Sequence, residues 1–255
     1  MQFLQNHLGL RGVRNSVHSL GHDYDFKLPR KFWWAGLLAA AGIGAATVLW
    51  GMNVRRISIT VLAISLLHAS PLLIGIAIVW GTRRLRLRIR DNMVNMIPWR
   101  GDERVLDVGA GSGITLIGCA HRLTSGKAIG IDIWDPNAGG GTSATFWKNV
   151  KVEGVADRVE LQNMDVRALS FADESIDVIV SSFAVHHFGG KADRAQAARE
   201  MARVLKPGGY VVIYDIVGVL PDIETVLRTE EFGQIEKKGR LIGHLFAQKP
   251  SILTA

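Results

Sequence analysis

The chain of 255 residues is long enough for one α/β domain of about 150 residues and a smaller appended region. Its net charge of +7 is unevenly placed: residues 1–100 hold 13 Lys and Arg against three Asp and Glu, whereas residues 101–255 hold 17 against 20. The basic character therefore belongs to the N-terminal part, which argues against a nucleic-acid-binding catalytic face and favours contact with a membrane surface. The single cysteine, Cys119, excludes an intrachain disulfide.

Two long stretches without a charged side chain follow a mixed polar tail over residues 1–31. They cover residues 32–50 and 57–80, which are 19 and 24 residues long. At about 1.5 Å of rise per helical residue they reach roughly 28 and 36 Å, enough to cross a hydrocarbon core of about 30 Å. We therefore expect a transmembrane helical hairpin over residues 32–80.

Tryptophans and small residues support this hairpin. Four of the seven tryptophans lie at the ends of the two stretches, where an aromatic belt would hold them at the membrane surface. They are Trp33, Trp34, Trp50 and Trp80. Gly36, Ala40 and Gly44 repeat at four-residue spacing, which favours close packing of the first helix against the second.

Positive charges lie on the outer sides of the predicted hairpin. Five Lys and Arg precede the first stretch and five Arg follow the second within residues 81–90, whereas the loop over residues 51–56 holds two. Because positively charged flanks stay in the cytoplasm, we expect an integral membrane protein with two spans and with both termini and the C-terminal domain cytoplasmic. Residues 81–100 are interpreted as a basic juxtamembrane connector, with Pro98 as a break before a domain over residues 101–249.

The most informative stretch is R-V-L-D-V-G-A-G-S-G-I-T-L, from Arg104 to Leu116. A short apolar run typical of a buried parallel strand precedes three glycines at alternate positions, and apolar residues at helical spacing follow. A strand, a glycine turn and a helix together place backbone N–H groups against a ligand. The dinucleotide fingerprint G-x-G-x-x-G would need a glycine where Ile114 stands, so the spacing departs from it. Ser112 is the expected N-cap of the helix.

Strand-like and helical segments alternate through the rest of the domain. Asp132 ends the second strand, 25 residues beyond Asp107. A carboxylate at this position faces the ribose of a bound nucleotide, and NAD is one cofactor that it would fit. The alternation predicts an α/β fold with a doubly wound, mostly parallel seven-stranded sheet, whose last two strands pair as an antiparallel edge. The expected strands cover residues 105–108, 128–133, 158–163, 175–182, 210–217, 234–240 and 244–248.

Five stretches, in order along the chain, carry a family resemblance. They read V-L-D-V-G-A-G-S-G, A-I-G-I-D-I-W, N-M-D-V, D-V-I-V-S-S-F-A-V-H-H-F and L-K-P-G-G-Y-V-V-I. Over residues 101–249 the chain resembles the class I S-adenosylmethionine-dependent methyltransferases, in particular the small-molecule branch that includes ubiquinone/menaquinone-biosynthesis and arsenite methyltransferases. The resemblance implies the Rossmann-like fold of that class, methyl transfer as the activity and S-adenosyl-L-methionine as the cofactor.

The resemblance also implies roles for individual residues at the cofactor. Asp107 would anchor the glycine loop, and Asp132 would hold the ribose. Asp165 would accept a hydrogen bond from the adenine amino group, with the N–H of Val166 at a ring nitrogen. The other implied contacts are Ile133 on the adenine face, the backbone of Ser181 near the methionyl ammonium, and Gly109, Ala110, Gly111, Ser112 and Gly113 around the methionine moiety.

His186 and His187 follow the fourth strand at the cleft side of the predicted sheet, and histidine is the usual proton acceptor near neutral pH. They are the candidate catalytic bases if the acceptor must lose a proton. No N-P-P-Y-type tetrapeptide of the amino-methylating nucleic-acid enzymes follows that strand, and Cys119 stands alone, unlike the cysteine set of the arsenite enzymes. These absences favour an oxygen, carbon or small amine as the methyl acceptor and do not decide among the three.

The predicted anchor favours a small methyl acceptor that is associated with the lipid bilayer, lipid-like or quinone-like, and neither nucleic acid nor a metal ion is expected as a partner. A second hypothesis is a non-catalytic, membrane-tethered S-adenosylmethionine-binding regulator or assembly factor. An NAD-dependent oxidoreductase is disfavoured by Ile114 and by the paired terminal strands. The sequence leaves the oligomeric state open.

Overall fold

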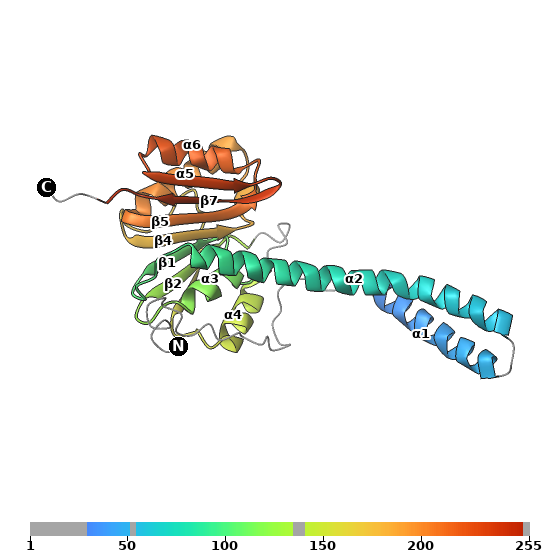
Figure 1. Ribbon diagram of the computed structural model, residues 1–255. Coiled ribbons are helices and arrows are strands. Elements are labelled where there is room, and N and C mark those ends of the chain that lie inside the picture. Colours follow the sequence, from blue (N-terminus) through green and yellow to red (C-terminus); the bar gives the residue numbers. More distant parts are fainter. Residues whose placement is uncertain (1–29, 52–54, 135–140, 252–255) are drawn as a thin grey trace, which may run out of the picture.

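The computed structural model describes residues 30–51, 55–134 and 141–251. It consists of an α/β domain and two long helices, α1 (Arg30–Gly51) and α2 (Arg55–Asn95), which lie side by side and extend away from the domain (Figure 1). The predicted N-terminal tail lies almost wholly outside the described residues.

The domain is built on one sheet of seven strands in the order β3-β2-β1-β4-β5-β7-β6. β1 to β5 pair in parallel, and β7 runs antiparallel to both β5 and β6. This sheet confirms the predicted mostly parallel arrangement with an antiparallel edge pair. The strands are β1 (Arg104–Val108), β2 (Lys127–Asp132), β3 (Val159–Asn163), β4 (Ile176–Ser182), β5 (Leu205–Ile216), β6 (Gln234–Gly239) and β7 (Ile242–Gln248).

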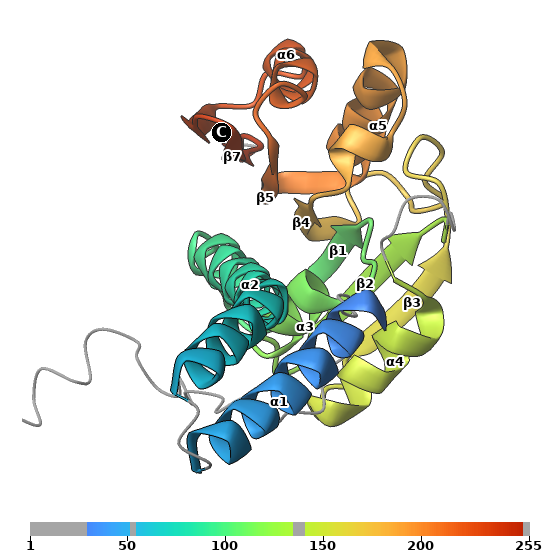
Figure 2. The ribbon, with the colours of Figure 1, turned by 90° about the vertical axis from the view of Figure 1, so that its right-hand side faces the viewer.

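Helices cover both faces of the sheet, so its parallel strands are buried on two sides, as their apolar sequences require. The domain helices are α3 (Ile114–Ala120), α4 (Ser143–Val152), the short 3₁₀ helix η1 (Val185–His187), α5 (Lys191–Val204) and α6 (Leu220–Thr229). The last part of α2 covers one face together with α3 and α4, and α5 and α6 cover the other (Figure 2). Leu116 and Phe146 are buried in the first of these cores, and Met201 and Leu227 in the second.

α2 is one unbroken helix that continues past Trp80, where the apolar stretch ends, as far as Asn95. Ile89, Met93 and Val94 on its last turns are buried in the core of the domain. Most of the predicted connector, residues 81–95, is therefore helical, and its last turns pack on the domain. The physical reason is that Ile89 and Met93 lie four residues apart, so they share one side of the helix and are buried together in the core.

α1 packs on α2 through small residues; of the predicted row, Gly36 lies at this contact, whereas Ala40 is exposed and Gly44 does not lie at it. A side chain at Gly36 would collide with Leu72, and one at Gly42 would collide with Ser65. By contrast, a Cβ at Gly44 would have nothing within 4 Å. The buried Ala39 lies three residues from both Gly36 and Gly42 and continues this contact row.

By length and composition, one described helix is able to cross a membrane, over Ile59–Asn95, and the apolar part of α1, Gly36–Trp50, is shorter. The predicted pair of spans is therefore not confirmed. Large apolar side chains on both helices nevertheless face outward: Leu38 is 62% exposed and Leu67 is 70% exposed. Exposed apolar surface of this extent marks a region that contacts lipid or another protein.

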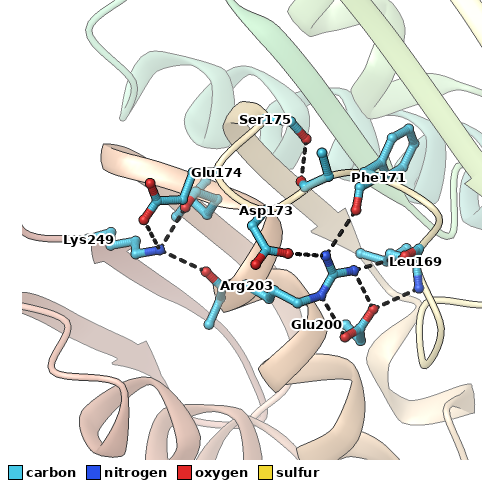
Figure 3. Close-up of polar contacts among 11 residues, drawn as sticks. Leu169, Phe171, Asp173, Glu174, Ser175, Glu200, Arg203 and Lys249 are labelled. Carbon is cyan, nitrogen blue, oxygen red and sulfur yellow. Dashed lines mark hydrogen bonds and ion pairs between the residues drawn. The ribbon is translucent and has the colours of Figure 1, made fainter.

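Arg203 on α5 fixes the segment that leads from β3 to β4 (Figure 3). Its guanidinium donates to the carbonyl oxygens of Leu169 and Phe171, at 2.8 and 3.0 Å, and to the carboxylate of Glu200 at 2.8 Å. Arginine can hold several acceptors at once because its five N–H donors have a fixed planar geometry. The segment begins near Asp165, so Arg203 restrains the backbone that follows this residue.

Met93→Ala should destabilise the domain by about 2–5 kcal/mol, because removing a fully buried side chain leaves a cavity. The measurement is the free energy of unfolding of the full chain in detergent micelles. Asn92→Ala, at the exposed neighbour on the same helix, is the matched control and should change it by less than about 0.5 kcal/mol. Equal, small effects of both substitutions would show that the end of α2 is not part of the folded core.

Candidate active site

The loop after β1 turns sharply on its glycines. Gly109, Gly111 and Gly113 have φ angles of 74°, 49° and 85°, which residues with a Cβ rarely adopt. At Gly109 a side chain would also collide with Ala184, on the loop after β4. The N–H of Gly109 donates to the carbonyl of Ile131 at 2.9 Å. The glycines therefore keep the loop close against the end of β2.

The prediction that Ser112 caps the following helix is wrong. The N-cap position of α3 belongs to Gly113, and no side chain caps it. Ser112 is buried, and its carbonyl oxygen accepts from Nδ2 of Asn149 at 2.9 Å. The left-handed turn at Gly113 starts the helix one residue later than a serine cap would.

A cleft of about 770 Å³ opens at the edge of the sheet where β1, β2 and β4 end. This volume lies within the usual range of small-molecule sites. Eleven predicted site residues line it: Asp107, Gly109, Ala110, Gly111, Ser112, Asp132, Ile133, Asp165, Val166, His186 and His187. Gly113 and Ser181 do not line it. Ser181 is buried, and its hydroxyl donates to the carbonyl of Val108 at 2.8 Å.

Asp132 ends β2 and is held by backbone N–H groups. Its two carboxylate oxygens accept from Gly111 and Trp134, at 2.9 and 2.8 Å. Each oxygen of an ionised carboxylate has a further lone pair. Asp132 is therefore fixed in place and still able to accept from two hydroxyl groups of a ligand. Ile133, which follows it along the cleft, is 55% exposed.

Asp107 differs from the other two carboxylates that line the cleft, Asp132 and Asp165, because it is only 1% exposed. Burial raises the pKa of Asp107 to about 7; a hydrogen bond from the backbone of Leu116 offsets part of this rise, and the charge of Asp132 adds to it. Within the described part of the chain, Oδ1 of Asp107 accepts no hydrogen bond. A buried, unpartnered carboxylate oxygen is costly unless a donor or cation meets it. Asp107 therefore fits a ligand that brings a positively charged group into the cleft.

Asp165 lines the cleft but already has a partner. Both of its oxygens accept from the guanidinium of Arg167, Oδ2 at 2.6 Å and Oδ1 at 3.0 Å, and this pairing lowers the pKa of Asp165. Arg167 also pairs with Asp193 at 3.0 Å. Any adenine amino group at Asp165 would share the carboxylate with Arg167. Val166, the implied backbone donor, is buried next to it, and both adenine contacts stay predictions.

His186 is held by a buried carboxylate that the sequence analysis missed. Asp215 near the end of β5 is fully buried, and its Oδ1 lies 2.7 Å from Nδ1 of His186. Because an ionised carboxylate only accepts hydrogen bonds, Nδ1 is the donor in this contact, and in the neutral ring the lone pair is then on Nε2. The N–H of Ile216 also donates to Asp215, at 2.7 Å. His187 is more exposed, and its ring centroid lies 3.9 Å from that of His186.

The strand order contains a signal that points to Asp215. β4 and β5 are parallel neighbours, and Ser182 pairs with Tyr214. Carboxyl ends of neighbouring parallel strands meet at one edge of a sheet. An acidic residue directly after Tyr214 is therefore expected beside the loop that carries both histidines.

One wall of the cleft comes from α2, which the sequence analysis did not assign to the site. Five residues of α2 line the cleft: Thr82, Arg83, Leu85, Arg86 and Ile89. These residues lie within eight positions, and four of them (Thr82, Leu85, Arg86 and Ile89) follow the three- and four-residue spacing of one helix face. The same helix carries the apolar stretch, so one continuous element joins that stretch to the cleft.

Comparison with known proteins identifies relatives of this domain. Residues 106–213 match the protein family described as "Methyltransferase domain". The demethylmenaquinone methyltransferase of Bacteroides fragilis is 31% identical over 127 residues, which cover 50% of this chain and 49% of that protein. The ubiquinone/menaquinone biosynthesis C-methyltransferase of Geotalea daltonii is 35% identical over 124 residues, or 48% of this chain and 49% of the relative. The chain thus spans about half the length of the curated relatives it matches.

The fold agrees with these relatives. The crystal structure of a SAM-dependent methyltransferase from Aquifex aeolicus superposes on this chain with a TM-score of 0.52 and 21% identity. The matched region covers 65% of this chain and 92% of the Aquifex chain. The family match begins within β1 and ends within β5, so it includes the glycine loop, Asp132 and His186. Residues 106–213 therefore form a methyltransferase domain with a Rossmann-like fold, whose cofactor is S-adenosylmethionine.

Proposed function

We propose that this chain is a membrane-anchored S-adenosylmethionine-dependent methyltransferase whose acceptor is a small lipid-like or quinone-like molecule. The observation that carries the proposal is the composition of one cleft. It is lined by the glycine loop, by His186 held on Asp215, and by the helix that continues into the apolar stretch. A cofactor site, a proton acceptor and a membrane-directed helix would then act at a single place.

The residues of the cleft suit the cofactor. S-adenosylmethionine, when bound, supplies a methyl group on a positively charged sulfonium. The unpartnered oxygen of Asp107 suits the methionyl ammonium, because a cation would stabilise the ionised carboxylate that burial disfavours. The free lone pairs of Asp132 suit the two ribose hydroxyls.

His186 is the proposed general base. Asp215 keeps Nδ1 of His186 protonated and the ring oriented, so Nε2 is the atom that accepts a proton from the acceptor. The imidazolium that results is stabilised by the buried carboxylate. Methyl transfer is an in-line displacement, so the remaining task of the cleft is to orient the acceptor.

Anchoring in a membrane is supported by α1 and the first part of α2. Both expose large apolar side chains, such as Trp34 at 67% and Leu73 at 61%, which soluble surfaces rarely gather. The positive charges outside the two apolar stretches favour a hairpin of two spans with both termini and the methyltransferase domain in the cytoplasm. The names of two relatives refer to quinones, which supports an acceptor held in the bilayer.

A second function class uses the same cofactor site without catalysis, as a membrane-tethered regulator. The His186–Asp215 pair favours the enzyme, because a sensor of the cofactor needs no oriented base. Release of S-adenosylhomocysteine on incubation with a membrane lipid extract separates the two.

At a pH of about 8, Asp107→Asn should make the cofactor-free chain more stable than the wild type, by an amount on the order of a few kcal/mol. The pKa of Asp107 is raised from 3.8 to about 7 in the fold. The protonated Asp107 therefore contributes its full stabilisation when the pH is below 3.8, and this stabilisation is lost as the pH rises through about 7. The measurement is the free energy of unfolding of both chains at a pH of about 5 and about 8.

The difference in free energy of unfolding between Asp107→Asn and the wild type should be smaller at a pH of about 5 than at a pH of about 8. Asp157→Asn, at a carboxylate whose side chain is 74% exposed, is the control and should show no such trend. A difference between Asp107→Asn and the wild type that does not grow with pH would contradict a buried, destabilised charge.

Asp132→Ala should weaken binding of S-adenosylhomocysteine at least tenfold, since each lost hydrogen bond to a charged acceptor is worth about 1.5–3 kcal/mol. Calorimetry on the full chain measures the affinity. Asp132→Asn keeps the acceptor oxygen for one of the two backbone donors and should lose less. An unchanged affinity in Asp132→Ala would remove the ribose assignment.

Asp215→Asn should slow methyl transfer by about 10²-fold or more, because Nδ1 of His186 would no longer be held as a donor. The rate is the release of S-adenosylhomocysteine from saturating cofactor with a membrane lipid extract. The double variant with His186→Ala should be no slower than His186→Ala alone, since both changes remove one function. Additive losses with unchanged cofactor affinity would assign Asp215 a separate structural role.

Leu67→Lys combined with Leu73→Lys should release the chain from membranes during a carbonate wash. Both leucines are more than half exposed, at 70% and 61%, and a lysine in a membrane span costs about 2.5–3.5 kcal/mol. Lysines at the exposed domain positions Asn92 and Asp157 are the matched control and should leave the chain in the pellet. A wild-type chain that the wash removes would contradict the anchor.

A further inference from the structure

Half of the large apolar side chains that the α/β domain exposes lie at one turn. Over the described residues from β1 onward, six large apolar side chains are exposed, and three of them lie where β5 ends and β7 begins. Leu241 is 83% exposed, Ile216 is 44% exposed and Ile242 is 39% exposed. Ile216 and Ile242 are partners in the pairing of β5 with β7, so their side chains lie next to each other. We call Ile216 together with residues 238–242 the hairpin tip.

The backbone of the hairpin tip is held in place. Gly239 has a φ of 132°, and a Cβ at this position would collide with the backbone of Gly243. The N–H of Val217 donates to the carbonyl oxygen of Leu241 at 3.0 Å. A defined turn therefore presents Leu241 to its surroundings. Neighbouring apolar side chains that an ordered turn exposes mark a contact surface.

The hairpin tip lies at the same edge of the sheet as the cleft and reaches beyond it. β4 ends at Ser182, which pairs with Tyr214, and Ile216 follows two residues later, roughly 7 Å farther along the strand. Ile216 directly follows Asp215, the residue that holds His186. The tip lies on the side of the domain toward which α2 extends (Figure 1). The hairpin tip and the apolar stretch of α2 thus lie beyond the same edge of the sheet.

Two of the three apolar side chains also lie on the face of the sheet that packs on α2. Side chains alternate along a strand, so Ile216 lies on the same face of β5 as Val212, four residues earlier. Val212 is buried in the core that contains Met93 of α2. Ile216, and Ile242 beside it, therefore lie on the face from which α2 leaves the domain. A lipid surface that receives the apolar stretch of α2 would then be close to these side chains.

Basic side chains precede Leu241 in the hairpin tip. Arg240 is exposed, and over the described ranges no carboxylate forms an ion pair with it. Lys238 is 70% exposed and pairs with Glu236 at 2.5 Å. Basic residues next to exposed apolar ones suit the surface of a bilayer that contains anionic lipids. Lysines on the edge strand β6 oppose the addition of a further strand, so a protein partner that extends the sheet is disfavoured.

We propose that the hairpin tip is a second membrane contact, with Leu241 among the lipid headgroups and Arg240 at lipid phosphate. A guanidinium group pairs with phosphate through two N–H donors. The inference rests on the membrane anchoring proposed above and goes beyond it, because the anchor alone attaches the domain at one place. A second contact would keep the cleft edge of the sheet, with His186 and Asp215, turned toward the bilayer. A lipid-like acceptor would then have a short path from the bilayer into the cleft.

The test uses the full chain in nanodiscs of phosphatidylcholine and phosphatidylserine with added phosphatidylcholine that carries a diazirine near the headgroup end of its acyl chain. After illumination, mass spectrometry measures the lipid attached to residues 238–243 and, in the same sample, to residues 59–80 of α2. The variants are Leu241→Gln, the conservative Leu241→Ile and, as the matched control, Val152→Gln. Calorimetric affinity for S-adenosylhomocysteine checks that each variant is folded.

Val152 suits the control because it is an apolar residue, 45% exposed, at the end of α4. α4 lies beside β3, at the opposite edge of the sheet from β6 (Figure 2). A change in labelling that follows from any loss of exposed apolar surface would therefore appear in Val152→Gln as well.

We expect lipid on residues 238–243 in the wild type and in Leu241→Ile. We expect a loss of about threefold or more in Leu241→Gln, whose polar side chain gains little from leaving water, and no loss in Val152→Gln. Lipid on residues 59–80 without lipid on residues 238–243 would overturn the second contact, whether water or a second copy of the chain covers the tip. Equal labelling of residues 238–243 in Leu241→Gln and the wild type would overturn it as well.

The charge of Arg240 is tested in the same nanodiscs. Leaving out phosphatidylserine should lower the labelling of residues 238–243 about twofold or more in the wild type, because basic residues are attracted to an anionic surface, and less in Arg240→Gln. Lys191→Gln, at an exposed lysine that begins α5, is the control of equal charge change and should respond as the wild type does. Equal responses of Arg240→Gln and the wild type would contradict the lipid partner of Arg240.

Failure of the proposed function is distinguishable from failure of this contact. Lipid on residues 238–243 but not on residues 59–80 would keep the hairpin tip as a membrane contact and remove the anchor. Lipid on both segments without release of S-adenosylhomocysteine from a lipid extract would keep both contacts and remove the enzyme.

Discussion

The left-handed turns of the glycine loop are the constraint on which the cleft depends. Because Gly109 and Gly111 adopt positive φ, the chain leaves β1 and stays against the end of β2. There the carbonyl of Ile131 and the carboxylate of Asp132 accept hydrogen bonds from backbone N–H groups of the loop. The loop is therefore formed before any ligand binds, with Asp107 buried beneath it. A preformed site loses less conformational freedom on binding, so more of the contact energy appears as affinity.

Continuity of α2 connects this preformed site to the apolar part of the chain. Met93 fixes the end of the helix in the core, and Arg83 and Arg86 line the cleft on the same helix. A flexible linker would let the cleft turn freely, whereas a packed helix holds it at one orientation. An acceptor dissolved in the bilayer would then be presented to the cleft at a high effective concentration.

The sequence was sufficient for the parts of the fold that have local signatures. Buried strands, the glycine loop and the terminal strand pair follow from short patterns of apolar residues and glycines. The features that the sequence does not predict depend on contacts between distant segments or on backbone angles. Asp215 meets His186 only through the pairing of β4 with β5, and the helix start at Gly113 depends on its φ angle. The arginines beyond Trp80 resemble a polar connector until the core that buries Met93 is known.

The measurement that tests the central claim most directly is a calorimetric titration of the full chain, in detergent micelles, with S-adenosylhomocysteine and with NAD in parallel. Both ligands carry an adenosine that an acidic residue at the end of β2 is able to hold. Of the two, only S-adenosylhomocysteine carries an ammonium group, which is the group proposed to meet the buried, unpartnered oxygen of Asp107. We expect saturable binding of S-adenosylhomocysteine at one site per chain and no heat from NAD. Saturable binding of NAD without binding of S-adenosylhomocysteine would contradict the assignment of the cleft.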